Sequence, residues 1–146
     1  MLNIVLISDG NHETATLKSS NISLIDRLVW LLNTQYGGSI LHGGYGGWVR
    51  FMLEGNSGGR ASIKMKYFHG AGGDSPVTRG VIQTNRQAVY LNGADIVVNG
   101  HNHNAYYVPI VQESLSDAGK VIFSTQHHIR TPGYKSEYND GTKGWA

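Results

Sequence analysis

Two segments in which apolar residues recur at every second position constrain the fold most. The segments span residues 48–54 and 63–68, and the tetrapeptide NSGG lies between them at residues 56–59. A period of two is typical of half-buried strands, and a short Gly-containing link favours a hairpin. The sequence therefore predicts an antiparallel hairpin with one face turned inward. The inward positions are Val49, Phe51, Leu53, Ile63, Met65 and Tyr67.

The rest of the chain predicts short strands and two helices. Apolar residues at helical spacing indicate a helix over about residues 22–33, and Ser75-Pro76 opens a second helix that Gly93 ends. Short apolar strands are expected at residues 3–7, 95–99, 106–112 and 121–125. From Arg130 onward the sequence carries no periodicity. We expect one α/β domain of mixed sheets and helices.

Composition narrows the classes of function. No run approaches 18 apolar residues, and no basic segment leads into an apolar stretch at the N-terminus. We therefore expect no membrane span or secretory signal, and a cytoplasmic location. The chain has no cysteine, so any metal must use nitrogen and oxygen ligands. A net charge of +2 is too small to argue for nucleic-acid binding on electrostatics alone.

Metal-ligating side chains follow several predicted strands, each beside a glycine. His101 and His103 come just after residues 95–99, and Asn11 lies in the equivalent place after residues 3–7. His69 ends the hairpin. Open α/β sheets place ligand sites at strand ends, so these side chains are expected to meet around a divalent ion such as Mn²⁺, Zn²⁺ or Fe²⁺. Structural roles are expected for three further histidines, His42, His127 and His128.

The tetrapeptides GNHE (residues 10–13) and GHNH (residues 100–103), with His69 between them, resemble a known pattern. In this order they are similar to the last three sequence blocks of the calcineurin-like metallophosphoesterases. The resemblance spans residues 3–111, and the tail resembles that of phage-type members. It implies a four-layer α-β-β-α sandwich in which two metal ions clamp a phosphoester while a metal-bound hydroxide attacks phosphorus.

The resemblance also implies individual roles. Four side chains would be metal ligands: Asn11, His69 and His101 for the second ion, and His103 for the first. His12 would protonate the leaving oxygen or stabilise charge on the phosphoryl group. Glu13 would orient His12. The substrate would be a phosphoester, such as nucleic acid, a phosphoprotein, a cyclic nucleotide or a small ester.

Two further blocks of that family, D-x-H and G-D-x-x-D, occur nowhere in the sequence. They would supply most ligands of the first ion and the bridging aspartate. We therefore expect residues 1–146 to form a single incomplete metallophosphoesterase domain. On its own the chain should bind at most one ion tightly and have little or no esterase activity.

Three other interpretations were weighed. The chain could be a non-catalytic metal-binding or interaction module derived from a phosphoesterase. Other histidine-based hydrolases fit less well, because the Asp-His of metallo-β-lactamase-like enzymes and the hydroxyl of H-x-[ST] motifs are missing after His101. Nucleic-acid binding alone would use aromatic residues next to basic ones, as in KMKYF and RTPGYKSEY.

Overall fold

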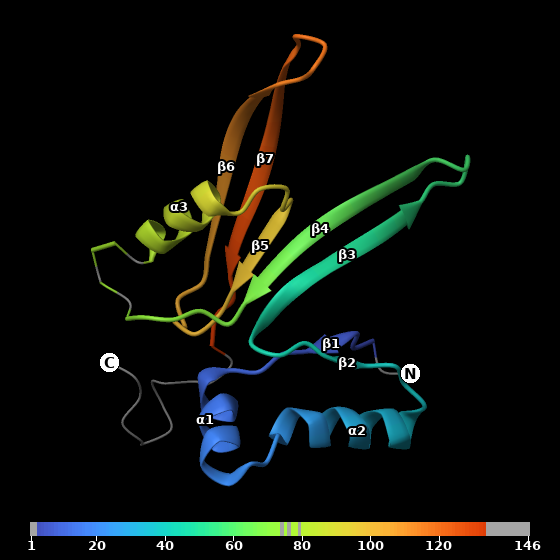
Figure 1. Cartoon of the computed structure of the whole chain (residues 1–146), viewed down its shortest axis with the longest axis vertical. Helices are drawn as coiled ribbons and strands as arrows, with labels where there is room; N and C mark the ends of the chain where they lie inside the picture. Colours follow the sequence, from blue (N-terminus) through green and yellow to red (C-terminus); the bar gives the residue numbers. More distant parts are fainter. Residues whose placement is uncertain (1–2, 74, 76, 79, 134–146) are drawn as a thin grey trace.

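The computed structural model describes residues 3–73, 75, 77–78 and 80–133. These residues form a mixed α/β structure with three helices, a five-stranded mixed sheet and a separate two-stranded sheet (Figure 1). Within this part of the chain, every helix is too short or too polar to cross a bilayer. Of the tail for which a resemblance to phage-type members was predicted, residues 127–145, the part after residue 133 lies outside the described residues.

The predicted hairpin is confirmed and is longer than its alternating core. Two of its predicted inward positions, Phe51 and Leu53, are exposed, because they lie on the part of the hairpin that extends beyond β5. Strand β3 (Gly46–Glu54) pairs antiparallel with β4 (Arg60–Phe68), from Gly46 opposite Phe68 to Glu54 opposite Arg60. Strand β5 (Ile96–Asn99) is parallel to both of its neighbours, β4 and β7, and the sheet order is β3-β4-β5-β7-β6. Because β5 has only four residues, the two flanking hairpins diverge beyond it as two arms (Figure 1).

The second arm extends further than the sequence predicted. Strand β6 (Tyr106–Leu115) pairs with β7 (Val121–Arg130), and the turn occupies Ser116–Lys120. His127 and His128, expected to follow a strand, therefore lie within one. The continuation was missed because the last half of β7 carries polar residues on its buried face, and a buried polar side chain breaks the hydrophobic alternation that signals a strand.

Helix α3 (Val81–Tyr90) covers one face of the sheet beside β5. Gln112 Nε2 donates to the carbonyl of Ala88 on α3, and Gln126 Nε2 donates to the carbonyl of Ala94 in the loop after α3. The sheet is therefore joined to this helix and its loop by polar contacts.

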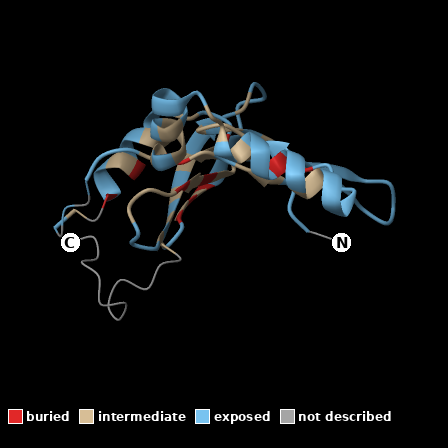
Figure 2. Ribbon diagram, turned by 90° about the horizontal axis from the view of Figure 1, so that it is seen from below, coloured by how far each residue is buried: buried red, intermediate tan, exposed pale blue. Residues whose placement is uncertain are grey.

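The buried residues of Figure 2 are few. The apolar ones are Val29, Ile40, Ala94 and Val97, and the polar ones are Thr84, Asn99, Gln126, His128 and Arg130.

The start of α3 differs from the prediction. The helix begins after Gly80, which has φ +78°, instead of at Ser75-Pro76. Glycine is needed there for two reasons: few side chains adopt this backbone conformation, and a Cβ atom would collide with the guanidinium of Arg130. A tertiary contact, not local propensity, therefore fixes this helix end.

The N-terminal region forms a small unit below the carboxyl ends of β4 and β5 (Figure 1). Strands β1 (Leu6–Ile7) and β2 (Leu41–His42) pair in parallel, and helices α1 (Asn11–Ser20) and α2 (Leu24–Tyr36) lie next to them (Figure 1). Ser23 caps α2 by accepting the Asp26 N–H at 3.1 Å, so the helix begins at Leu24, two residues later than predicted. Helix α1 was not predicted, because Leu17 is almost its only large apolar residue.

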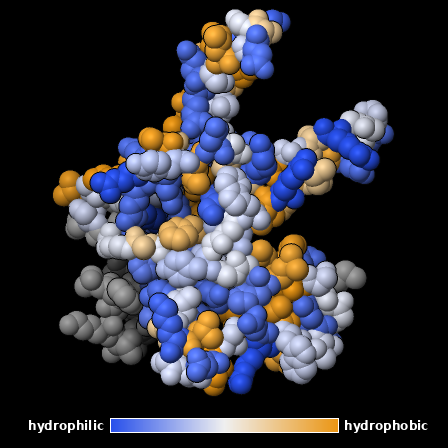
Figure 3. All heavy atoms as spheres, viewed as in Figure 1, coloured by the Kyte–Doolittle hydropathy of each residue, from blue (hydrophilic) through white to orange (hydrophobic). Residues whose placement is uncertain are grey.

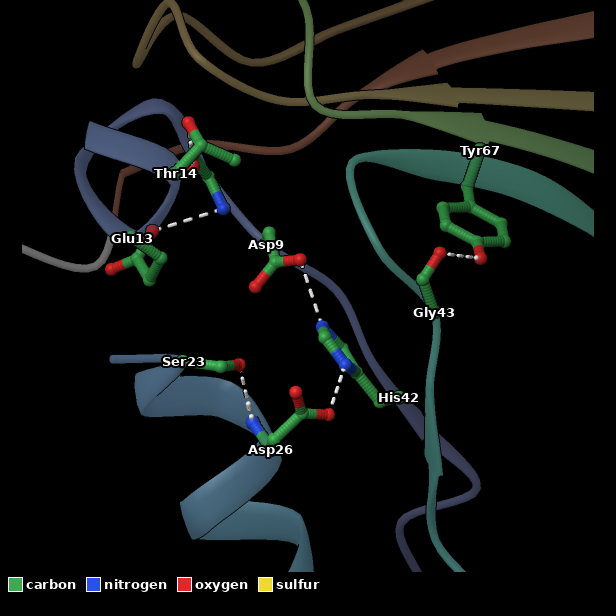
Figure 4. A network of polar contacts seen from close by, with 9 residues as sticks. Asp9, Glu13, Thr14, Ser23, Asp26, His42, Gly43 and Tyr67 are labelled. Atoms are coloured by element: carbon green, nitrogen blue, oxygen red, sulfur yellow. Dashed lines mark hydrogen bonds and ion pairs between the residues drawn. The ribbon is translucent and has the colours of Figure 1, made fainter. Parts of the chain in front are cut away.

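One hydrogen bond ties the two sheets together. The hydroxyl of Tyr67, on β4, donates to the carbonyl of Gly43 at 2.6 Å (Figure 4). The ring lies so close to Gly43 and Gly47 that a Cβ atom at either position would be 2.5 Å from the Tyr67 oxygen. Tyr67 points away from the α3 side, because neighbouring Phe68 pairs with Asn99, which contacts α3. The small sheet therefore sits opposite α3.

Candidate metal centre

Three chain segments that are distant in sequence meet at one edge of the large sheet. Asn11 begins α1 after β1, His69 follows β4, and His101 follows β5. Strands β4 and β5 are parallel, with Phe68 opposite Asn99, so their carboxyl ends lie side by side. The Gly100 N–H donates to the His69 carbonyl at 2.9 Å. This bond continues the hydrogen-bond pattern between β4 and β5 up to the site.

The polar atoms of these side chains converge on His69. Its Nε2 lies 2.9 Å from Asn11 Oδ1 and 3.4 Å from His101 Nδ1, and the two imidazole centroids are 5.3 Å apart. Ligands bound tetrahedrally at about 2.1 Å lie roughly 3.4 Å from one another. The three atoms are therefore spaced as ligands of one ion would be, with Asn11 slightly closer.

Close packing of backbone makes this convergence possible. A Cβ atom at Gly10 would lie 3.0 Å from His69 Cε1, so glycine lets the ring approach the start of α1. Gly70 has φ +106°, and a Cβ there would be 3.1 Å from the Gly100 carbonyl. His101 itself has φ +71°, which is uncommon for a residue with a side chain. Such backbone strain persists only where surrounding contacts impose it, and it is frequent at functional sites.

Burial lowers the pKa of His69, and the positive charge that His101 can carry lowers it further. The nearby carboxylate of Glu13 opposes this effect. A lowered pKa keeps the imidazole neutral near pH 7, which leaves a nitrogen lone pair available to a metal ion. The edge of Tyr45 packs against the ring, with centroids 5.3 Å apart, and its hydroxyl donates to the Gly70 carbonyl at 2.8 Å.

The fourth predicted ligand, His103, is not placed with the other three. It is exposed, and its ring lies against Gly133, where a Cβ atom would be 2.8 Å from His103 Cγ. Within the described residues, no group of three or more His, Cys, Asp or Glu side chains could hold a metal. The centre is thus two imidazoles and one amide.

The two predicted catalytic residues lie on the first turn of α1, not on an irregular turn. His12 is exposed, and its charge is close enough to lower the pKa of His69. Glu13 Oε2 accepts the Gly10 N–H at 2.9 Å, a local bond that closes the start of the helix. The observed partner of Glu13 is therefore backbone, and its orientation of His12 stays a prediction.

A second polar cluster was not anticipated. His42 lies between two carboxylates, with Nε2 2.8 Å from Asp9 Oδ2 and Nδ1 2.5 Å from Asp26 Oδ1 (Figure 4). The cluster joins the loop after β1, the end of β2 and the first turn of α2. The sequence offered a partial signal, since Asp9 and His42 each stand at the end of a short apolar segment. Asp26 gave none.

The cluster should make stability depend on pH. Burial acts against the charged form of His42, but the hydrogen bonds to Asp9 and Asp26 outweigh it and raise the pKa above 6.5. The stability that His42 confers is therefore complete below pH 6.5 and is lost as the pH rises through its folded-state pKa. The hydrogen bond from Ser23 and then that from His42 lower the pKa of Asp26 below 3.8, so its contribution is lost only at more acidic pH.

We therefore expect the difference in melting temperature between wild type and His42→Gln to be largest between pH 3.8 and 6.5. It should shrink as the pH is raised above 6.5 and through the raised pKa of His42, where the imidazole loses its charge. Thermal melts of both proteins across this range give the measurement. A difference that stays constant from about pH 5 to 8.5 would show that the charge of His42 is unimportant.

The other two histidines make ordinary structural contacts. His128 is fully buried, its Nε2 lies 2.8 Å from Gln126 Oε1, and burial lowers its pKa. His127 Nδ1 lies 2.7 Å from the hydroxyl of Tyr107, and the two rings stack. Neither belongs to the metal centre.

Comparison of the chain with known protein families, with curated proteins and with solved structures gave no match.

Proposed function

We propose that this chain carries one metal site of a metal-dependent phosphoester hydrolase of the calcineurin-like type. The observation that supports this most strongly is the convergence of Asn11, His69 and His101, three residues that belong to the sequence blocks resembling that family. Residues separated by 58 and 32 positions in sequence meet here within hydrogen-bonding distance of one ring nitrogen.

The layers of the structure support the same proposal. Helix α3 lies on one face of the large sheet, the small β1–β2 sheet lies toward the other face, and α1 and α2 lie beyond it (Figure 1). These elements would correspond to parts of the four-layer sandwich that the resemblance implies, with only two strands in the second sheet.

The donor set suits a divalent ion that accepts imidazole and amide ligands, such as Zn²⁺, Mn²⁺ or Fe²⁺. Asn11 Oδ1, His69 Nε2 and His101 Nδ1 would hold it. When bound, such an ion polarises a phosphoryl oxygen and lowers the pKa of water. His12, exposed on the first turn of α1, would deliver a proton to the leaving oxygen, and Glu13 would keep that turn in place through Gly10.

Metal titration tests the proposal directly. Isothermal calorimetry with Zn²⁺ or Mn²⁺, followed by metal analysis after gel filtration, should show one tightly bound ion per chain. Hydrolysis of bis-p-nitrophenyl phosphate should be weak or absent, because the described residues form no cluster with carboxylates that could hold a second ion. Absence of any bound ion would overturn the proposal, and two tight ions would overturn the one-ion stoichiometry.

A non-catalytic metal-binding module is the second candidate, and the lack of a carboxylate ligand in the described centre favours it. The two candidates differ in what happens when the missing acidic ligands are supplied. A segment carrying D-x-H and G-D-x-x-D blocks, added in trans, should produce hydrolysis if the chain is part of an enzyme. A module without catalytic function would bind metal and stay inactive.

A further inference from the structure

The β3–β4 arm carries its charged residues on one of its two faces. Side chains alternate between the faces of a strand, and Tyr67 points away from the α3 side, so the even-numbered residues of the arm lie on the α3 side. Residues directly opposite each other in an antiparallel pair share a face. Four such pairs form the basic face of the arm: Trp48 with Lys66, Arg50 with Lys64, Met52 with Ser62, and Glu54 with Arg60.

Three of the four cations on the basic face have no ionic partner within the described part of the chain. Arg60 Nε lies 3.5 Å from Glu54 Oε1. Arg50, Lys64 and Lys66 make no ion pair there. Positive charge is therefore concentrated on this face, although the whole chain has a net charge of only +2.

Neighbouring elements leave the basic face open. A Cβ atom at Gly93, in the loop after α3, would be 3.8 Å from Lys64 Nζ, which agrees with the placing of this side chain on the α3 side. Asp95 Oδ2 accepts the backbone N–H of Lys64 at 2.7 Å, so this carboxylate is held at the strand edge and makes no ion pair with the ammonium group. Helix α3 lies on the β6–β7 side of β5 and does not cover the arm (Figure 1). Figure 3 shows strongly hydrophilic residues along the arm.

An exposed tryptophan lies among these cations. Trp48 is 51% exposed, and Lys66 Nζ lies 5.6 Å from the centroid of its ring. The next pair along the arm, Arg50 with Lys64, is two residues away, which is about 6.8 Å in a strand. The basic face thus offers one aromatic ring and three cations within a short distance. Proteins bind unpaired nucleic acid with this combination, because bases stack on the ring and cations attract the phosphates.

We propose that the basic face of the β3–β4 arm binds single-stranded nucleic acid, with a base stacked on Trp48 and phosphates held by Arg50, Lys64 and Lys66. A duplex fits this face less well, because its bases are stacked on one another and offer no free surface to the indole ring. Binding here does not use the metal centre. The inference therefore goes beyond the proposed hydrolase function and does not depend on it.

The test measures binding without any metal ion. The full chain is titrated in EDTA into a fluorescein-labelled single strand of about 12 nucleotides, within the range that one binding domain covers, and into the matching duplex. Fluorescence anisotropy should show tighter binding of the single strand. The slope of log K against log salt concentration should be about −2, because each of three phosphate contacts contributes about −0.7. No binding, or tighter binding of the duplex, would overturn the proposal, as would displacement by polyglutamate as readily as by unlabelled single strand.

Trp48→Ala should weaken binding of the single strand about 5- to 150-fold, the value of one base stacked on an aromatic ring. Trp48→Phe keeps an aromatic ring and should recover most of this loss. Trp30→Ala is the matched control, because Trp30 is 68% exposed on α2, away from the arm. We expect it to bind as wild type does. An equal loss in the two alanine variants, or none in Trp48→Ala, would contradict stacking on Trp48.

Lys64→Gln should make the salt dependence shallower by about 0.7, the value of one phosphate contact. Lys120→Gln changes the net charge equally, but Lys120 is exposed in the turn of the other arm, so the slope should stay that of wild type. Equal changes in both variants would mean that only net charge matters, and would overturn the proposal. Binding of the oligonucleotide in a protein that binds no metal would refute the metal centre alone. The reverse pattern would refute the basic face alone.

Discussion

Replacing His69 with alanine is expected to lower the affinity for Zn²⁺ or Mn²⁺ by more than about 100-fold, because even residues that only support a metal ligand are worth about 10–100-fold. His69 is the residue to change because its Nε2 is the atom on which the centre converges, 2.9 Å from Asn11 and 3.4 Å from His101. Without it, one amide and one imidazole remain. Calorimetric titration of the folded variant measures the loss.

His127→Ala is the matched control for this experiment. It removes another imidazole that lies in β7 and bonds to Tyr107, outside the centre. We expect it to bind metal with wild-type affinity. If His69→Ala also kept its affinity within a few-fold, or if both variants lost it equally, the ion would have to be bound elsewhere in the protein.

Gly47→Ala is expected to lower the free energy of unfolding by about 1–3 kcal/mol, the usual cost of forcing extra volume into a packed site. Gly47 lies directly opposite Tyr67, and the new Cβ would be 2.5 Å from the phenol oxygen and 2.9 Å from Cζ. The ring must move, and its bond to the Gly43 carbonyl must lengthen or break. Since that bond joins the two sheets, we expect the loss to appear in urea unfolding monitored by circular dichroism.

Gly59→Ala provides the control for this prediction. A Cβ atom at Gly59 would have no atom within 4 Å, and the backbone there is not in the left-handed region. The same chemical change should therefore shift the unfolding free energy by no more than about 0.5 kcal/mol. A Gly47 variant as stable as the Gly59 variant would show that Tyr67 relaxes without cost.

The parts of this fold that the sequence predicted are those with a strong local signal. The β3–β4 hairpin follows from period-two alternation, and the neighbouring positions of His69 and His101 follow from the parallel ends of β4 and β5. Asn11 follows β1, in the separate small sheet, so its place beside His69 depends on how the N-terminal region packs.

The features that were missed depend on contacts between distant residues. Helix α1 has almost no apolar periodicity and is defined by its capping at Gly10 and Glu13. The last half of β7 buries Gln126, His128 and Arg130, whose polar side chains conceal a strand that is paired on both sides. The bridge through His42 joins residues 16 and 33 positions apart, a separation that no local pattern reveals.

The short central strand also determines how the sheet resists opening. Only Met65–Phe68 of β4 and His127–Arg130 of β7 are flanked by β5, so beyond those residues each arm is a two-stranded ribbon with an exposed inner edge. The free energy needed to open the backbone hydrogen bonds locally is therefore lowest at the two hairpin tips and highest for the residues paired with β5. His69 and His101 come just after the residues paired in β4 and β5, so the candidate centre lies beside the part of the sheet that opens last.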